Sequence, residues 1–400
     1  MTHWVPELLA PAGSLEKLKV AISYGADAVY LGGQNFGLRS AADNFTDSEL
    51  REGVSYAHSH DALVYVVLNS FLHDRDLDDL PAFLHLLDEL KVDAVIVSDL
   101  GVVRTVIANS NLVVHLSTQA SCVNANSAAL WKEMGVQRIV LGREVSIEEA
   151  RKIKEKVEIE IEMFVHGSMC MAFSGNCVIS NYTQGRDSNR GGCAHSCRFE
   201  YSLEKDNEKK YAFFMSSKDL QGLRLLEEFI SAGIDSLKVE GRMKSNHYAA
   251  TISKVYSNAL DYYREKGSFL SDDIYEWEQE LAKMSHRDYT AASLITPADG
   301  TTIYSERQHS TGEAPLGGVV LETKENLYTL VEVRSRFKKG SHLEIVPFKG
   351  RTIHLDIEEL EDVSGEKFEQ TRPGMLLKLP YISGVESFNI IRVIGEARND

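Results

Sequence analysis

The chain has 400 residues, of which 43% are hydrophobic and 26% are charged. This composition is typical of folded globular proteins, and the length is sufficient for two or three domains. The net charge of −16 excludes a protein that coats nucleic acid generally, although a local basic patch would still allow RNA binding. The sequence has no apolar run of membrane-spanning length and no visible signal peptide, so we expect a cytoplasmic protein that does not enter membranes.

Eight short apolar runs alternate with longer amphipathic stretches over the first 266 residues. Such alternation predicts a parallel sheet that is covered by helices, and eight units match a TIM-like (βα)8 barrel. A doubly wound open sheet is the main alternative. We prefer the barrel because each run ends in a polar or glycine-containing cluster, and a barrel brings all these ends to one mouth. The expected strands are residues 7–10, 28–31, 63–68, 94–97, 113–116, 138–141, 159–165 and 236–239.

Four of the five cysteines lie in residues 166–201, which follow the seventh expected strand: Cys170, Cys177, Cys193 and Cys197. Disulfides are disfavoured in a reducing cytosol. Structural zinc sites favour two closely spaced pairs, whereas iron–sulfur clusters accept more varied spacing, and here only the last two cysteines are close. We therefore favour an iron–sulfur cluster, with zinc or metal-free buried thiols as alternatives. Cys122 stands alone, and we expect it to be a small buried side chain.

The rest of the chain completes the predicted organisation. The cysteine-rich residues 166–201 form an insertion at the mouth of a barrel domain, residues 1–266. Residues 203–211 are charged and predict an exposed hairpin or turn, and Ser217–Asp219 predicts the start of the helix before the eighth strand. Residues 267–311 predict a helical linker. Residues 312–400 contain short β-type runs separated by polar turns, which predict a small all-β, barrel-like domain.

Long motifs in this sequence resemble the collagenase-like peptidase family. They are ELLAPAGSLEKLKVAISYGADAVYLGG (residues 7–33), HLSTQAS (115–121), HGSMC…SGNC…RGGCAHSCR and SLKVEGRMKS (236–245). The resemblance is strongest to members that are prephenate-dependent tRNA wobble-uridine 5-hydroxylases. Others hydroxylate ribosomal RNA or act in the ubiquinone pathway, and the latter resemble the barrel alone. The resemblance implies a [4Fe-4S] cluster on Cys170, Cys177, Cys193 and Cys197, tRNA as substrate, prephenate as co-substrate, and a paralogous protein as partner.

Candidate site residues lie at the expected strand ends and in the cysteine-rich stretch. Glu240 and His166 are the candidate proton acceptors. Side chains that can bind a base edge or an anion supply the rest of the site: Tyr30, Asn69, Gln119, Arg143, Glu144, Arg186, Arg190, Arg242 and Lys244. A collagenase-like peptidase is the main alternative, although the sequence has no H-E-x-x-H and no G-x-S-x-G motif. The other alternative is a non-catalytic partner in a hydroxylation complex.

Overall fold

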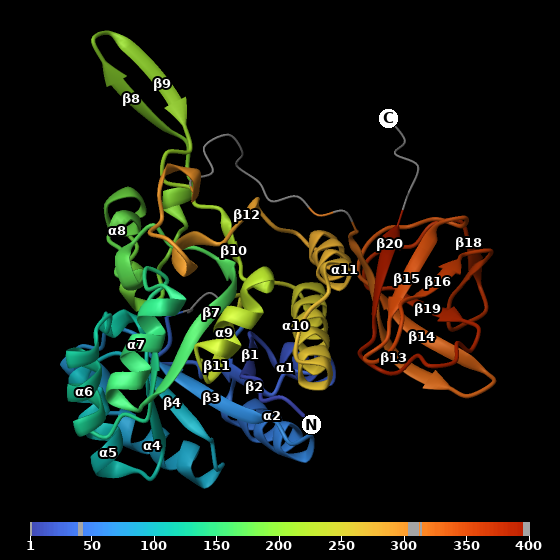
Figure 1. The fold of residues 1–400 in the computed structure, drawn as a ribbon. Coiled ribbons are helices and arrows are strands. Elements are labelled where there is room, and N and C mark those ends of the chain that lie inside the picture. Colours follow the sequence, from blue (N-terminus) through green and yellow to red (C-terminus); the bar gives the residue numbers. More distant parts are fainter. Residues whose placement is uncertain (1, 39–42, 303–311, 313, 395–400) are drawn as a thin grey trace.

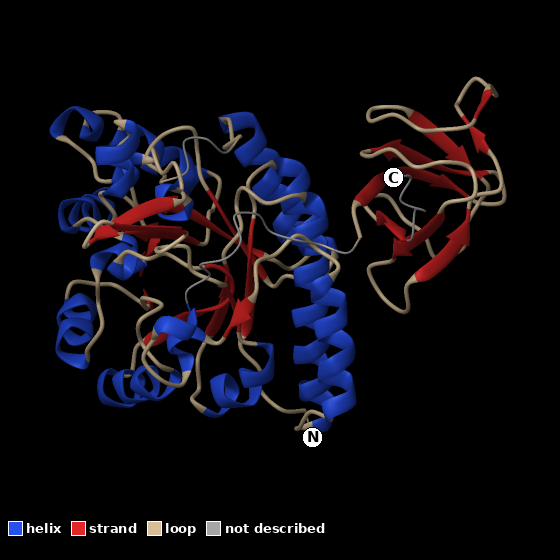
Figure 2. Ribbon diagram, turned by 90° about the horizontal axis from the view of Figure 1, so that it is seen from above, coloured by secondary structure: helices blue, strands red, loops and turns tan. Residues whose placement is uncertain are grey.

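The structure is a computed structural model that describes residues 2–38, 43–302, 312 and 314–394. A β-barrel wrapped by helices lies beside a smaller all-β domain (Figure 1). Seen from above, helices surround the barrel strands, and long helices stand between the barrel and the β domain (Figure 2). No helix in the described part of the chain combines the length and hydropathy that crossing a membrane requires.

Eight parallel strands form the barrel, and the sheet closes because β11 pairs with both β7 and β1. The strands are almost entirely buried, which is why they read as apolar runs in the sequence. The predicted (βα)8 barrel is confirmed, and the largest difference in bounds is at β7, which continues to Ser168. The barrel strands are β1 (Glu7–Pro11), β2 (Ala28–Leu31), β3 (Leu63–Leu68), β4 (Ala94–Val97), β5 (Val113–Leu116), β6 (Arg138–Val140), β7 (Glu160–Ser168) and β11 (Ser236–Val239).

Helices cover the barrel, and polar residues just after the strands begin several of them. The Ser14 hydroxyl accepts a hydrogen bond from the Lys17 backbone N–H at the start of α1. Thr46 and Ser146 begin α2 and α7 with capping boxes. The helices are α1 (Leu15–Ser23), α2 (Asp47–Ser59), α3 (Asp74–Leu77), α4 (Leu80–Glu89), α5 (Leu100–Asn109), α6 (Ala125–Glu133), α7 (Ile147–Val157), α9 (Leu226–Ser231) and α10 (Asn246–Lys266).

The segment between β7 and β11 carries the four clustered cysteines. It contains α8 (Ile179–Gln184) and the predicted hairpin, β8 (Tyr201–Lys205) and β9 (Glu208–Ala212), which projects from the body (Figure 1). The prediction that Ser217–Asp219 begins a helix is wrong. Instead, β10 (Asp219–Gln221) pairs antiparallel with the end of β7, and α9 begins only at Leu226. Because β7 runs on beyond its neighbours, its extra backbone groups need partners, and β10 supplies them.

The chain leaves the barrel through α10 and continues into α11 (Ser271–Ala282). It then returns to the barrel, where β12 (Tyr289–Thr290) pairs in parallel with β10. Of the expected linker, residues 303–311 lie outside the described residues. So do residues 1 and 39–42 of the expected barrel domain, and 313 and 395–400 of the expected β domain.

The C-terminal domain is an antiparallel sheet with strand order β16-β15-β20-β13-β14-β19. The predicted all-β domain is confirmed. The β-type runs of the sequence, residues 317–322, 327–333, 342–346, 352–355 and 387–392, do not include β17, β18 or β19, which have only two to four residues each. The strands are β13 (Leu316–Lys324), β14 (Tyr328–Val333), β15 (His342–Val346), β16 (Ile353–Asp356), β19 (Leu376–Leu379) and β20 (Ile390–Ile394), with a separate pair, β17 (Leu360–Glu361) and β18 (Lys367–Phe368).

Candidate active site at the mouth of the barrel

A cavity of about 400 Å³ opens at the carboxyl ends of the barrel strands. One side is lined by residues that directly follow strands, including Asn69 after β3, Arg143 after β6 and Glu240 after β11. The other side is lined by the cysteine-bearing segment, from Ser168 to Arg198. Because all parallel strands of a barrel end at one face, this is the face where such barrels carry their active sites.

The four clustered cysteines, Cys170, Cys177, Cys193 and Cys197, all line this cavity. All five cysteines of the chain lie in the described residues, and none of them is in a disulfide. Burial raises the pKa of the Cys197 thiol, Arg198 lowers it, and the three other cysteines raise it further. The four thiols are therefore close enough to influence one another. Within the described residues, no three His, Cys, Asp or Glu side chains are arranged to hold a single metal ion.

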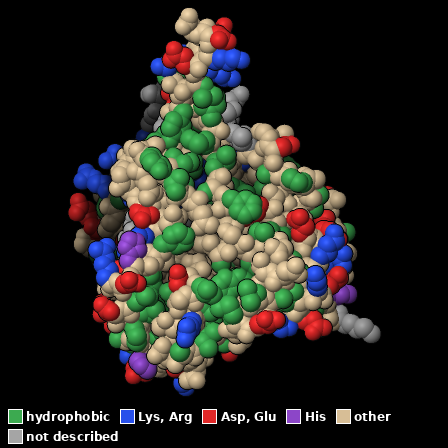
Figure 3. All heavy atoms as spheres, turned by 90° about the vertical axis from the view of Figure 1, so that its left-hand side faces the viewer, with side chains coloured by type: hydrophobic (Ala, Val, Ile, Leu, Met, Phe, Trp, Pro, Cys, Tyr) green, Lys and Arg blue, Asp and Glu red, His purple; other side chains and the backbone are tan. Residues whose placement is uncertain are grey.

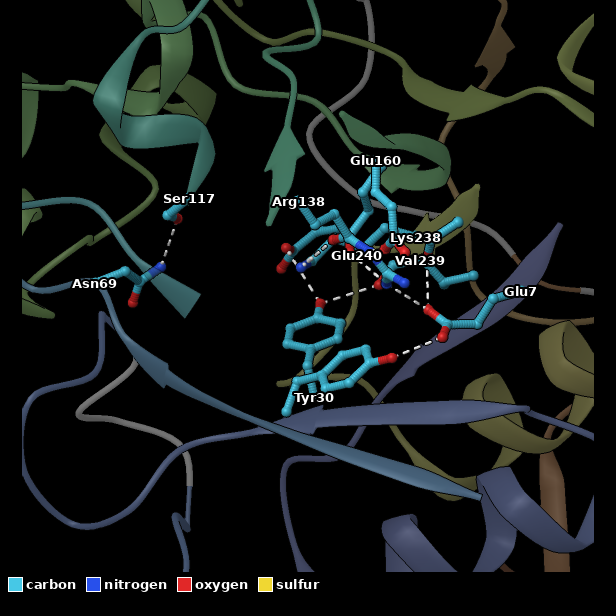
Figure 4. Close-up of polar contacts among 12 residues, drawn as sticks. Glu7, Tyr30, Asn69, Ser117, Arg138, Glu160, Lys238, Val239 and Glu240 are labelled. Carbon is cyan, nitrogen blue, oxygen red and sulfur yellow. Dashed lines mark hydrogen bonds and ion pairs between the residues drawn. The ribbon is translucent and has the colours of Figure 1, made fainter. Parts of the chain in front are cut away.

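Two cations lie over aromatic rings inside the cavity. The Arg143 guanidinium is 3.7 Å from the ring centroid of Phe164, and the Lys238 ammonium is 4.4 Å from that of Tyr30. Lys238 Nζ also lies 2.7 Å from Oε1 of the buried Glu162. Figure 4 shows Lys238 and Tyr30 side by side, close to Glu240. Stacking on a ring leaves the charge of a cation in place, whereas Glu162 partly offsets the charge of Lys238.

Arg242 follows β11 and is buried against the loop after β2. Its Nη2 donates a hydrogen bond to Asn44 Oδ1 at 2.5 Å. A Cβ on Gly32 would come within 2.7 Å of that nitrogen, so this position needs glycine for the guanidinium to fit. The glycine that ends the second strand therefore serves to place Arg242 at the cavity.

Lys244 and Arg287 add two further cations to the cavity wall. Burial lowers the pKa of Lys244 and that of Arg287. Arg287 Nη1 lies 3.7 Å from Oδ1 of the buried Asp219, and this carboxylate partly offsets the cost of burial. A cation whose charge is disfavoured by its surroundings gains stability when an anion binds next to it. The wall is thus suited to an anionic ligand.

Glu240 is an acidic side chain of the cavity lining, and it faces these cations. Its Oε2 lies 3.5 Å from the hydroxyl of Tyr30 and 3.7 Å from Nη2 of Arg143. The Tyr30 hydroxyl also donates to the Val239 carbonyl at 2.9 Å, and the Tyr248 hydroxyl donates to the Glu240 carbonyl at 2.7 Å. Figure 4 shows Tyr30 pointing at the end of β11. These contacts hold the carboxylate at the cavity, where it can accept a hydrogen bond or a proton.

Two amide side chains, Asn69 and Gln119, lie on the cavity wall. Asn69 Nδ2 donates to Ser117 Oγ and to Gln119 Oε1, each at 3.4 Å, and the Ser117 hydroxyl donates to Gln119 Oε1. Asn69 Oδ1 accepts from the Leu38 backbone N–H at 3.3 Å. Figure 4 shows Asn69 and Ser117 pointing at one another. The network fixes the direction of both amides, which recognition of a base edge requires.

His166, a candidate proton acceptor, does not line the cavity. Its buried ring packs against Tyr256 and Tyr289, with ring centroids 5.7 and 5.2 Å away, and Nδ1 is 3.1 Å from the Tyr256 hydroxyl. Burial lowers the pKa of His166 to about 3. The imidazole is therefore neutral near pH 7, and its observed contacts join β7 to α10.

Glu144, Arg186 and Arg190 also lie outside the cavity lining. Glu144 accepts a hydrogen bond from the Ser174 hydroxyl, which ties the loop after β6 to the cysteine-bearing segment. Arg190 Nη1 lies 2.6 Å from Asp76 Oδ2, and this hydrogen bond holds the pKa of Asp76 at about 2. Arg186 is exposed just after α8. Arg190 thus positions the cysteine-bearing segment against α3. Of the remaining candidates, the cavity brings together all four cysteines with Tyr30, Asn69, Gln119, Arg143, Glu240, Arg242 and Lys244.

Several cavity residues were missed by the sequence analysis. Lys238 had a usable signal, because polar and apolar residues alternate along β11 and place Lys238 on the same side as Glu240. Phe164 lies in an apolar strand, so nothing in the sequence indicated that its ring lines the cavity. Arg287 had no local signal, since it follows α11 and reaches the cavity only because β12 returns to the barrel.

Comparison with known proteins assigns the family. Residues 13–302 match the model of Peptidase family U32, and residues 315–392 match that of the Peptidase family U32 C-terminal domain. The chain is 41% identical to the tRNA hydroxylation protein P1 of Bacillus subtilis over 97% of this chain and 94% of that protein. It is 32% identical to the tRNA hydroxylation protein P of Escherichia coli over 90% of each chain. It is 37% identical to the 23S rRNA 5-hydroxycytidine C2501 synthase of E. coli over 64% of this chain and 39% of that protein. The chain therefore belongs to Peptidase family U32 and carries the C-terminal domain of that family.

Proposed function

We propose that this protein is an RNA hydroxylase that converts the wobble uridine of tRNA to 5-hydroxyuridine, with prephenate as co-substrate and a [4Fe-4S] cluster as redox centre. The observation that carries the proposal is that four cysteines and a set of cations line one cavity at the barrel mouth. Two relatives that match nearly the whole chain are named tRNA hydroxylation proteins, which supports tRNA as the substrate. A third is named for 5-hydroxylation of a ribosomal RNA base.

Cys170, Cys177, Cys193 and Cys197 would hold the cluster. Four thiolates are the usual ligand set of a [4Fe-4S] centre, and these four share one wall of the cavity. A bound cationic centre would stabilise their thiolate forms, as Arg198 already does for Cys197. When bound, the cluster supplies one-electron redox chemistry at the mouth of the barrel.

The other cavity residues divide into three groups by chemistry. Arg143, Lys238 and Arg242 would bind the two carboxylates of prephenate, because a guanidinium matches a carboxylate with two parallel hydrogen bonds. Asn69 and Gln119 would hydrogen-bond the edge of a uracil that has left its stack. Glu240 lies within reach of Tyr30 and Arg143, and it would exchange a proton with the substrate.

The name of the family gives a peptidase as the alternative, and the cavity favours RNA. A hydrolase needs an activated nucleophile or a metal-bound water, and the sequence has neither an H-E-x-x-H nor a G-x-S-x-G motif. A peptide bond is neutral, whereas the described lining carries several Arg and Lys side chains and only one carboxylate, that of Glu240. Such a balance suits an anionic substrate.

The proposal is tested by complementing a deletion strain and measuring 5-hydroxyuridine-derived nucleosides in its tRNA by mass spectrometry. Wild-type protein should restore them, whereas Cys170→Ser should not and should lack iron, sulfide and brown colour after anaerobic purification. Cys122 is buried in the barrel core and does not line the cavity, so Cys122→Ala is the matched control. A deletion strain with unchanged tRNA modification would reject the function, and zinc as the only metal would reject the cluster.

A further inference from the structure

The segment that forms one wall of the cavity, together with its hairpin, exposes four aromatic side chains. Tyr182 is 87% exposed, Phe173 61%, Tyr211 58% and Phe199 36%. These four residues, here named the aromatic rim, all belong to the cysteine-bearing segment and its hairpin. Exposed rings gathered beside a cavity are a feature of binding surfaces.

The rim lies directly next to the cavity along the chain. Cys170, Cys177 and Arg198 line the cavity. Phe173 lies between the two cysteines in the sequence, and Phe199 directly follows Arg198. Tyr182 is on α8, whose first two residues also line it. Figure 3 shows hydrophobic side chains gathered at the base of the projecting hairpin. The rim therefore belongs to the same segment that forms one wall of the cavity.

The charge around the rim favours an anionic partner. Residues 169–218 contain seven basic residues (Lys and Arg) and five acidic residues (Asp and Glu). The whole chain instead has more acidic than basic residues, 59 against 43. On the hairpin, Lys209 Nζ lies 5.1 Å from the ring centroid of Tyr211. A positive segment on an otherwise strongly acidic protein attracts a polyanion to this one face.

The surroundings of the rings distinguish RNA from a protein partner. Tyr182 is flanked along the chain by the exposed polar residues Asn181, Thr183 and Arg186, and Met171, Val178 and Leu203 of the same segment are exposed as well. Rings flanked by cations and amides suit the stacking of unpaired bases, and the net positive charge of this segment favours RNA over an uncharged protein surface. We propose that the aromatic rim stacks the unpaired nucleotides that flank the target base, and thereby holds an RNA loop open at the cavity. This inference rests on the proposed function.

The test measures binding of an unmodified tRNA transcript and of its isolated anticodon stem–loop by the holoenzyme. Stacking on one ring contributes enough affinity that Phe173→Ala and Tyr182→Ala should each weaken binding roughly 5- to 100-fold. Tyr182→Phe keeps the ring and should bind as wild type does. Tyr275 on α11 is 59% exposed and does not line the cavity, so Tyr275→Ala is the matched control and should have no effect. Iron content and prephenate binding should be unchanged in all four variants.

The possible failures are distinguishable. If wild type hydroxylates tRNA and the Ala variants bind both RNAs as tightly as it does, the rim does not stack bases. If the Ala variants instead lose self-association in size-exclusion chromatography while RNA binding is intact, the rim is a protein interface, and the inference is again wrong. If wild type neither binds nor hydroxylates tRNA, the proposed function fails, and the inference fails with it.

Discussion

Glu240 and Arg242 are two positions apart after β11, yet their surroundings give them different roles. The Arg242 guanidinium is buried beside glycine, where it can bind an anion, so under the proposed function Arg242→Ala should weaken prephenate binding by about tenfold or more. Glu240→Gln keeps the size of the side chain but removes its capacity to take a proton. It should leave binding within a few-fold and lower turnover by about 10²- to 10⁴-fold. Calorimetric binding and single-turnover hydroxylation assays separate the two effects, and equal loss of binding in both variants would contradict this division.

Two buried histidines should make the stability of the fold depend on pH. Burial lowers the pKa of both His166 and His247 to about 3. In the unfolded chain each titrates near pH 6.5, so between about pH 6.5 and 3 the unfolded state binds more protons than the folded state. The free energy of unfolding should therefore fall as pH drops below about 6.5, by roughly 1.4 kcal/mol per pH unit for each histidine.

Denaturant unfolding at pH 7.5, 6 and 5 measures this dependence. His166→Gln and His247→Gln should each make the slope less steep, since glutamine does not titrate. His60 is exposed, and His60→Gln should leave the slope as it is in wild type. A slope that neither buried-site variant changes would show that other groups cause the acid sensitivity.

At the scale of whole elements, the barrel was predictable because parallel strands buried on both faces appear as apolar runs. The structure adds polar caps at the starts of α1, α2 and α7, which agree with that pattern. The antiparallel β10 was not predictable, because it depends on how far β7 extends beyond its neighbours. The contribution of Arg287 was not predictable either, since pairing between β12 and β10 is a long-range event with no mark in the local sequence.

Neighbouring strands β7 and β11 are joined inside the barrel by a buried ion pair, Glu162 with Lys238. Glu162 is 0% exposed, and Arg138 Nη1 lies 3.5 Å from its other oxygen, Oε2. Glu162→Gln would leave both cations buried without this charge, so it should lower the free energy of unfolding by about 3–5 kcal/mol. Glu160 also pairs with Arg138, at 2.8 Å, but its side chain is 52% exposed, and Glu160→Gln should cost less than about 1 kcal/mol.

Chemical denaturation of the two variants tests this contrast, and equal destabilisation would contradict it. A double substitution, Glu162→Leu with Lys238→Met, should recover much of the lost stability, because it removes both members of the pair. The double variant should still lose activity if Lys238 binds the co-substrate, which separates the structural from the functional role of the lysine.

On the scale of the molecule, the barrel and the C-terminal domain share a buried core. Val20 and Tyr24 from α1 and Ala249 and Ala250 from α10 pack against Val346 and Ile390 of the β domain. A second connection is ionic: Arg392 Nη1 on β20 lies 2.8 Å from Glu280 on α11 and 3.3 Å from Glu344 on β15. Both connections are buried or partly buried, so we expect the two domains to unfold as one cooperative unit.

Tyr24 is the residue at which this coupling is most directly tested. Its hydroxyl donates to the Val346 carbonyl at 2.5 Å and accepts from the Ile390 N–H at 3.0 Å, so it bridges two strands of the β domain from the barrel. Tyr24→Phe leaves both buried backbone groups without this partner, which should lower the free energy of unfolding by about 1–3 kcal/mol. The lost contacts are those between the two domains. Calorimetric melting should therefore show a lower first transition and a separation of β-domain unfolding from barrel unfolding. Tyr56→Phe is the control, since that hydroxyl contacts Ser23 on the barrel surface at 3.0 Å, and it should melt in one transition. A single transition at the same temperature in both variants would mean that the hydroxyl of Tyr24 does not couple the domains.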